Sequence, residues 1–270
     1  EKAKETDAEL VMASDPDADR VGAAVKNNEG EWVLLNGNQT ALMFVYYLIT
    51  RWKELGKING KEYIVKTIVT TETIKTIAER NGVEMYDVYT GFKWIANVMR
   101  ENEGKKNYIG GGEESYGFLC EDFVRDKDAV SACVILAEIA AWAKDQGLSL
   151  YQLLQKIYVE YGFSKEKGIS VVKKGKSGAE EIEAMMKKFR ENPLTEIAGS
   201  KVTYFYDYST LKGKDYAENE TVTLDMPTTS NVLQYFTEDN TKVSIRPSGT
   251  EPKIKFYCEV HSKVKNIDEL

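Results

Sequence analysis

Up to residue 161, the apolar positions follow two patterns, which are short runs typical of strands and the spacing typical of helices. Short apolar runs at 62–70, 83–90 and 107–122 have the length of strands, with a loop inside the third, and residues 9–35 read as short strands with a turn at Asn27–Glu31. Helical spacing of apolar residues recurs in the intervening segments, which are 40–55, 71–82, 91–102, 126–147 and 149–161. Because strands alternate with helices, this region is predicted to be an α/β domain.

Beyond residue 161 the pattern changes to strands in succession. The charged stretch 161–168 is interpreted as a linker, a strand is predicted directly after it, and residues 179–192 have helical spacing. Strands are then predicted at 201–209, 221–226, 231–237, 241–247 and 253–261. This succession predicts a separate small α+β domain with an antiparallel sheet. Gly175-Lys176-Ser177 is similar to the end of a nucleotide-binding P-loop, but that motif requires glycine where Ser170 stands, so we discard it.

The composition excludes several classes of function. The 270 residues are 42% hydrophobic and 29% charged, which is typical of a soluble globular protein. A net charge of −7 argues against a nucleic-acid partner, and no apolar run reaches the roughly 18 residues of a membrane span. The single histidine, His261, excludes a histidine-based triad. The cysteines, Cys120, Cys133 and Cys258, lack zinc or redox spacing and are expected to be buried or partly buried thiols.

Three aspartates are crowded into one short loop, at Asp15, Asp17 and Asp19. In an extended backbone, alternate residues point to the same side, so the three carboxylates would converge and repel. A hard divalent cation such as Mg²⁺ or Ca²⁺ removes that conflict. A calcium EF-hand is excluded, because Arg20 stands where that loop needs glycine and Lys26 where it needs glutamate. The alternative is a polar turn rich in Asp and Pro.

Three further stretches combine glycine with polar side chains. Gly110–Phe118 places two acids and a serine after three glycines, which suits a polyol ligand or a solvated hairpin tip. Arg246–Lys255 offers hydroxyls, backbone amides and cations for a phosphate, or else a Pro-Gly turn. Tyr89–Trp94 puts Lys93 in the first turn of a helix, which favours a bound anion nearby or a solvated lysine.

The order and spacing of these four motifs resemble the α-D-phosphohexomutase family, and the phosphoglucomutase branch most closely. The resemblance covers essentially the whole chain and implies a role for each matching residue. Asp15, Asp17 and Asp19 would bind Mg²⁺ together with a phosphoserine of another domain, beside Arg20, and Lys93 would contact substrate and act as acid or base. The residues implied to bind the sugar and its non-reacting phosphate are Thr90, Gly91, Glu113, Ser115, Arg246, Ser248, Gly249, Thr250 and Lys255.

The implied reaction interconverts glucose 1-phosphate and glucose 6-phosphate through the phosphoserine and glucose 1,6-bisphosphate. Glu114 and Tyr116 favour the phosphoglucomutase branch. Phosphomannomutases and phosphoglucosamine mutases usually have Met or Gln at the position of Glu114, and a His after Ser-Gly in the same loop. Phosphomannomutase or phosphopentomutase activity is an alternative, and a non-catalytic module that binds sugar phosphates is another.

The family's serine motif, of the Ala-Ser-His-Asn-Pro type, is not found in the sequence. We therefore interpret the chain as an inactive C-terminal fragment of a cytoplasmic enzyme. Expected partners are sugar phosphates, the missing N-terminal domains and, through an exposed strand edge in residues 1–36, a second copy. The expected fold is a three-layer α/β domain with a mixed sheet, followed by a smaller α+β domain with an antiparallel, TBP-like sheet. The expected segments are 1–36 from the second family domain, 37–161 as the third and 162–270 as the fourth.

Overall fold

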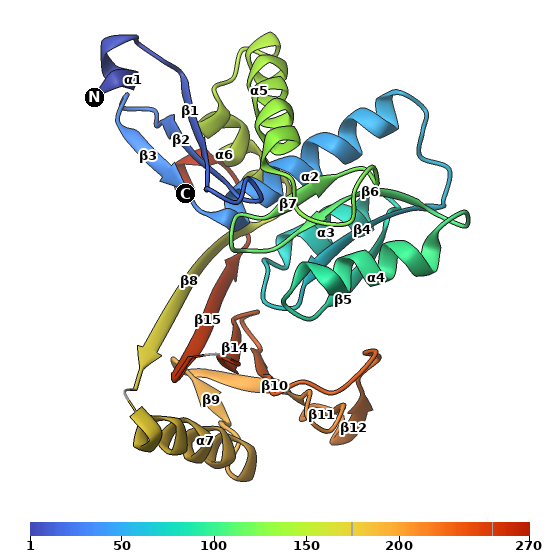
Figure 1. The fold of residues 1–270 in the computed structure, drawn as a ribbon, viewed down its shortest axis with the longest axis vertical. Helices are drawn as coiled ribbons and strands as arrows, with labels where there is room; N and C mark the ends of the chain where they lie inside the picture. The colour runs from blue at the N-terminus through green and yellow to red at the C-terminus, as the bar shows by residue number, and fades with distance from the viewer. Residues whose placement is uncertain (174, 250) are drawn as a thin grey trace. The chain divides into compact units, whose positions relative to one another are not determined.

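The computed structural model describes residues 1–173, 175–249 and 251–270 and divides the chain into two units (Figure 1). The first unit contains Glu1–Phe163 together with Lys263–Leu270, and the second contains Ser164–Ser262. The second unit is therefore inserted between two segments of the first. In the described residues, no helix is both long enough and apolar enough to cross a membrane.

The first unit begins with a three-stranded antiparallel sheet in the order β1–β2–β3. Its elements are α1 (Lys2–Glu5), β1 (Leu10–Ser14), β2 (Val21–Lys26) and β3 (Trp32–Leu35). Ser14 pairs with Val21, so the aspartate loop is the connection between β1 and β2. Alternate residues of β2 are buried, as in a strand with one covered face.

A four-stranded mixed sheet in the order β5–β4–β6–β7 forms the centre of the first unit. β5, β4 and β6 are parallel, and β7 is antiparallel to β6. The strands are β4 (Glu62–Thr67), β5 (Glu84–Val88), β6 (Asn107–Gly112) and β7 (Phe118–Cys120). The helices are α2 (Gly37–Glu54), α3 (Thr73–Arg80), α4 (Phe92–Asn102), α5 (Ala129–Asp145) and α6 (Leu150–Tyr161).

Apolar side chains cover both faces of this sheet. Every residue of β4 is buried. Because side chains alternate along a strand, Ile64 lies on one face of the sheet, and Tyr63 and Val65 lie on the other. The Ile64 face packs with residues of α2, α3, α5 and α6, whereas the Tyr63 face packs with α4 through Phe92 and Ile95. Helices on both faces of a mixed sheet confirm the predicted α/β class of this region.

The second unit is a mostly antiparallel sheet with one long helix. The strand order is β12–β11–β10–β13–β14–β15–β8, and β9 pairs with β10. Its elements are β8 (Phe163–Val172), α7 (Gly175–Glu191), β9 (Glu196–Ile197), β10 (Ser200–Asp207), β11 (Lys212–Asp215), β12 (Glu220–Thr223), β13 (Leu233–Thr237), β14 (Lys242–Pro247) and β15 (Lys253–Ser262). Ile182 and Met186 of α7 pack against Leu233, Tyr235 and Ile245 of the sheet. The α+β prediction is confirmed.

The structure corrects the sequence reading in several places. The charged stretch predicted as a linker, 161–168, lies mostly within the strand β8, and the prediction of a linker is wrong. β11 was not predicted at all. The last eight residues, which end in the short helix η1 (Ile267–Glu269), belong to the first unit, although the predicted fourth domain ran to residue 270. The division into 1–36, 37–161 and 162–270 stays a prediction.

Candidate functional site

The aspartate loop is a tight turn, whereas its alternate spacing predicted an extended stretch. The Ala18 amide donates to the Asp15 carbonyl over 3.0 Å, and Ala18 has a φ of 55°, in the left-handed region. One carboxylate oxygen of Asp15 accepts hydrogen bonds of 3.2 Å from the amides of Asp19 and Arg20. Burial tends to raise the pKa of Asp15, but these backbone hydrogen bonds outweigh it and hold the pKa below its usual value.

The expected convergence of the three carboxylates is therefore wrong. Side chains two residues apart do not share a side once the backbone turns. Among the residues that the structure describes, no group of three or more His, Cys, Asp or Glu side chains is placed to hold a metal ion. The role of Asp15, Asp17 and Asp19 as magnesium ligands stays a prediction.

Lys127 is a candidate site residue that the sequence reasoning missed. Its Nζ lies 3.0 Å from Asp19 Oδ2 and 3.0 Å from Asp126 Oδ1, and only 10% of its side chain is exposed. The Lys127 stem lies so close to Gly117 that a Cβ there would be 2.1 Å from Cδ. Burial tends to lower the pKa of Lys127, but its hydrogen bonds to Asp126 and Asp19 raise it above its usual value. Lys127 thus connects the aspartate loop to the loop of residues 113–117.

Glu113 and Ser115, two of the residues predicted to bind the sugar, lie on that second loop, here called the sugar loop (residues 113–117). Glu113 is 5% exposed, and its Oε1 accepts a hydrogen bond of 2.7 Å from the Gly91 amide. The Glu113 amide donates to the Gly117 carbonyl over 2.8 Å, which closes the loop. The predicted motifs around Thr90–Gly91 and around Glu113–Ser115 are therefore brought together at the carboxyl ends of β5 and β6.

Lys93 lies in the first turn of α4, as the sequence predicted, and is exposed. It lines a pocket of about 580 Å³ whose other basic residues are Arg100 and Arg125. Glu103 and Asp126 also line this pocket, and Glu103 pairs with Arg125 at 3.6 Å. The cations outnumber the carboxylates, which suits an anionic ligand. The sequence did not predict this cluster of basic residues, because Arg125 lies on a loop far from Lys93 along the chain.

The predicted phosphate loop lies in the second unit, between β14 and β15. The Ser248 amide donates to the Lys253 carbonyl over 2.8 Å, and the Glu251 amide donates to Ser248 Oγ over 3.3 Å. Arg246 pairs in register with Lys255, so two basic residues lie opposite each other beside the turn. The hydrogen bond from Lys253 holds the pKa of Glu251 below its usual value. Gly249 lies in the turn, and Thr250 lies outside the described residues.

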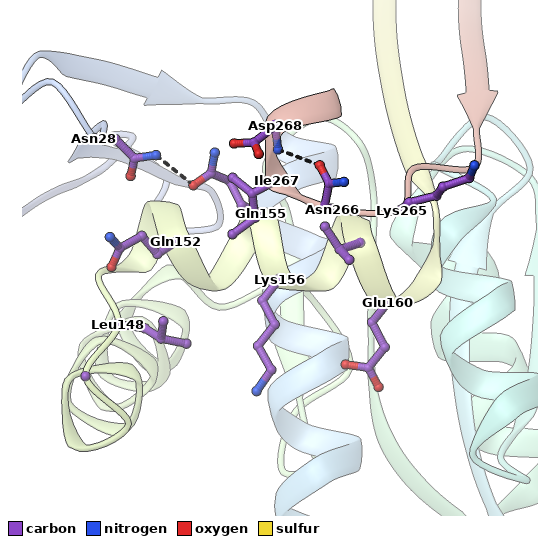
Figure 2. A pocket seen from close by; sticks show the side chains of 12 residues that line it. Asn28, Leu148, Gln152, Gln155, Lys156, Glu160, Lys265, Asn266, Ile267 and Asp268 are labelled. Carbon is purple, nitrogen blue, oxygen red and sulfur yellow. Dashed lines mark hydrogen bonds between the residues drawn. The ribbon is translucent and has the colours of Figure 1, made fainter.

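A pocket of about 740 Å³ lies elsewhere in the first unit, between α6 and the last residues of the chain (Figure 2). Gln152, Gln155 and Lys156 line it from α6, and residues 265–268 line it from the C-terminal segment. Asn28 donates to Gln155 Oε1 over 3.0 Å at its edge. None of the residues that line it belongs to a predicted motif.

Comparison with known proteins supports the family that the sequence resembles. The family described as "Phosphoglucomutase/phosphomannomutase, alpha/beta/alpha domain III" matches residues 36–161, and the family's "C-terminal domain" matches residues 170–269. A curated protein named Phosphoglucomutase from Staphylococcus aureus (strain USA300) is 37% identical over the whole chain, which covers 48% of that protein. The chain thus spans about half the length of the curated relatives it matches.

Solved structures share the fold. A phosphoglucomutase from Paramecium, parafusin in its open form, matches 96% of the chain with a TM-score of 0.62 and 17% identity, over 41% of its own length. The N-acetylphosphoglucosamine mutase of Aspergillus fumigatus, in complex with GlcNAc-6P and magnesium, matches 96% of the chain with a TM-score of 0.52 and 11% identity, over 50% of its length. The fold and the two family matches together define a protein with phosphohexomutase domains. The chain belongs to the phosphoglucomutase/phosphomannomutase family and contains its domain III and its C-terminal domain.

Proposed function

We propose that the chain supplies the sugar-binding and phosphate-binding parts of a phosphoglucomutase. Such an enzyme interconverts glucose 1-phosphate and glucose 6-phosphate by way of a phosphoserine and glucose 1,6-bisphosphate. The observation that carries the proposal is the hydrogen bond from the Gly91 amide to Glu113 Oε1, 2.7 Å long. It joins the sugar loop to the turn that precedes Lys93, so two of the predicted motifs adjoin at the carboxyl ends of β5 and β6.

Each part has its own role in this function. Glu113 and Ser115 hydrogen-bond to sugar hydroxyls, and Lys93 and Arg20 contact the transferring phosphoryl group. The non-reacting phosphate is held by the phosphate loop of the second unit, which comprises Arg246, Ser248, Gly249, Thr250 and Lys255. Phosphoryl transfer depends mainly on positioning and on the stabilisation of charge, which are the contributions that such groups make.

Magnesium is the proposed cofactor, because one solved relative is in complex with magnesium. The carboxylates of Asp15, Asp17 and Asp19 are hard oxygen donors of the kind that Mg²⁺ prefers. Their arrangement does not fit an ion, since Asp15 accepts two backbone hydrogen bonds and Asp19 pairs with Lys127. We therefore assign no step of the reaction to the metal.

Calorimetry with the purified chain tests the proposed binding function. We expect glucose 6-phosphate to bind saturably and more tightly than either inorganic phosphate or glucose alone. Arg246→Ala should weaken that binding at least about tenfold, because charge-assisted hydrogen bonds to a phosphate are the strong ones. Lys201→Ala, which removes an exposed cation from β10 of the same unit, is the matched control and should leave the affinity unchanged.

Two results would contradict the proposal. One is equal affinity for inorganic phosphate and for glucose 6-phosphate, because the sugar loop would then contribute nothing. The other is conversion of glucose 1-phosphate by the chain alone, followed by ³¹P NMR, because the sequence has no serine motif to carry the phosphate. Comparing mannose and ribose phosphates in the same titration decides which sugar this site prefers.

A further inference from the structure

The side chain of Glu114 contacts two buried threonines. Glu114 Oε2 lies 3.2 Å from Thr67 Oγ1 and 3.5 Å from Thr70 Oγ1. Both threonines are fully buried, and their hydroxyls are 2.8 Å apart. Thr67 ends β4, and the Thr70 amide donates to the Thr67 carbonyl over 2.9 Å. The carboxylate of Glu114 is thus attached to a rigid turn at the end of the central strand.

Two successive carboxylates therefore anchor the sugar loop to two neighbouring strands. Glu113 accepts from the Gly91 amide beyond the end of β5, and Glu114 accepts from the hydrogen-bonded pair of threonine hydroxyls at the end of β4. Because β4 and β5 are parallel and adjacent, these two anchors lie at the same edge of the sheet. The loop is held at two points along its first two residues.

The backbone of the sugar loop also contacts the start of α2 and the start of β2. A Cβ at Gly37, the first residue of α2, would lie 2.0 Å from the Glu114 carbonyl oxygen and 2.7 Å from the Tyr116 nitrogen. Only glycine permits so close an approach. The Val21 amide, at the start of β2, donates to the Tyr116 carbonyl over 3.1 Å. Ser115, between these two held residues, is partly exposed.

We propose that Glu114 is a positioning residue of the sugar site. Its carboxylate, hydrogen-bonded by Thr67 and Thr70, fixes the backbone of the sugar loop and thereby the placement of Glu113 and Ser115 toward a sugar. The inference rests on the proposed function for the identity of the ligand, but the anchoring itself is a property of the free chain. Glu114 acts through its neighbours and does not touch the substrate.

Amide hydrogen exchange of the whole chain, measured by NMR, tests the anchoring without any ligand. The amides of Val21, Gly91 and Glu113 donate to atoms of the loop, so their protection reports its placement. Glu114→Leu should raise their exchange rates about tenfold, because the leucine side chain has no acceptor. Glu114→Gln keeps one acceptor oxygen at the same length and should restore most of the protection.

A second pair of variants tests the same anchor from the other side. Thr67→Val with Thr70→Val removes both donors at constant shape and should raise exchange at the same three amides. Thr73→Val is the matched control, because the Thr73 hydroxyl is buried but has no hydrogen-bond partner among the described residues. Unchanged exchange in Glu114→Leu, or a rise that spreads equally through α5, would overturn the proposal.

The sugar titration separates this proposal from the proposed function. Glu114→Leu should weaken glucose 6-phosphate binding about tenfold, leave inorganic phosphate binding unchanged and be rescued by Glu114→Gln. Loss of phosphate binding as well would mean that the variant damages more than the sugar loop and would count against positioning. If the unaltered chain binds no sugar phosphate, the proposed function fails, and the exchange experiment still decides whether Glu114 anchors the loop.

Discussion

At the scale of single residues, the threonines at and after the end of β4 differ in whether their buried hydroxyls form hydrogen bonds. The hydroxyls of Thr67 and Thr70 form a hydrogen-bonded pair, and this pair lies within hydrogen-bonding distance of Glu114. The hydroxyl of Thr73, at the start of α3, is equally buried and has no hydrogen-bond partner in the described part of the chain. A buried hydroxyl without a partner costs stability, whereas a paired one contributes to it.

Thr73→Val should therefore stabilise the chain, by about 1 kcal/mol, because valine has the shape of threonine without the unpaired hydroxyl. Thr70→Val should destabilise it by a similar amount, about 1 kcal/mol, because the partners of that hydroxyl lose a hydrogen bond. Urea unfolding followed by circular dichroism measures both changes. Equal destabilisation by the two variants would show that the Thr73 hydroxyl has a partner.

At the scale of elements, the start of α2 supports the candidate site. Asn36 caps this helix: its side chain accepts from the Gln39 amide over 2.8 Å, and Gln39 Oε1 accepts from the Asn36 amide over 3.0 Å. The cap sets the first turn, in which Gly37 lies against the sugar loop. The sequence predicted a start at residue 40, because the polar residues before it carry no apolar periodicity.

Asn36→Ala should lower the free energy of unfolding by about 1 kcal/mol, because one orphan amide of the helix loses its acceptor. Asn36→Ser keeps a side-chain oxygen at the cap and should cost much less. Urea unfolding of the two variants provides the comparison. If both variants lose the same amount, capping does not determine where α2 begins.

A second prediction at this scale concerns pH and the strand β5. Lys106 hydrogen-bonds to Glu84 and, over 2.7 Å, to the hydroxyl of Tyr86. The hydrogen bond from Lys106 lowers the pKa of Glu84, so the pair stabilises the fold above the ordinary pKa of Glu, about 4.3, and loses this effect as the pH falls through the lowered value. Both side chains are partly exposed, so Lys106→Met should cost only about 0.5 kcal/mol near neutral pH.

The cost of Lys106→Met should shrink as the pH falls through the lowered pKa of Glu84, because a protonated Glu84 no longer pairs with the lysine. Urea unfolding at neutral pH and across an acid pH series measures it. Lys105→Met, which removes a neighbouring exposed cation whose Nζ bonds only to a backbone carbonyl in the described contacts, should show no such pH dependence. A cost that is constant with pH would contradict the assigned ion pair.

At the scale of the whole molecule, each unit has a hydrophobic core of its own. The core of the second unit is formed by residues of α7, β10, β13, β14 and β15, and the two cores of the first unit use residues up to Tyr161 and Phe163. Residues 164–262, about the size of an ordinary small domain, should therefore fold by themselves. The segment expressed alone should unfold cooperatively in urea, and a gradual, non-cooperative loss of ellipticity would contradict the expectation.

The sequence predicted most of the central elements because their apolar periodicity was strong, as in β4 and α5. It missed β11 and assigned residues 163–168 of β8 to a linker, because these residues are charged and mostly not buried, so they leave no apolar pattern. The site motifs were found by residue type and spacing. The contact of Lys127 with Asp19 was not, because it joins residues far apart along the chain. The aspartate loop misled us, since alternate spacing implies convergence only while the backbone is extended.

The insertion of the second unit has a consequence for the order of synthesis. On the ribosome, residues 1–163 emerge before the inserted unit, yet the segment 263–270 of their own unit emerges only after all of residues 164–262. The face of α6 beside Ile267 and Asp268 therefore stays uncovered while the inserted unit is being made. The nascent chain can complete its first unit only after the inserted unit has been translated, and a pause within residues 164–262 would prolong that exposed stage.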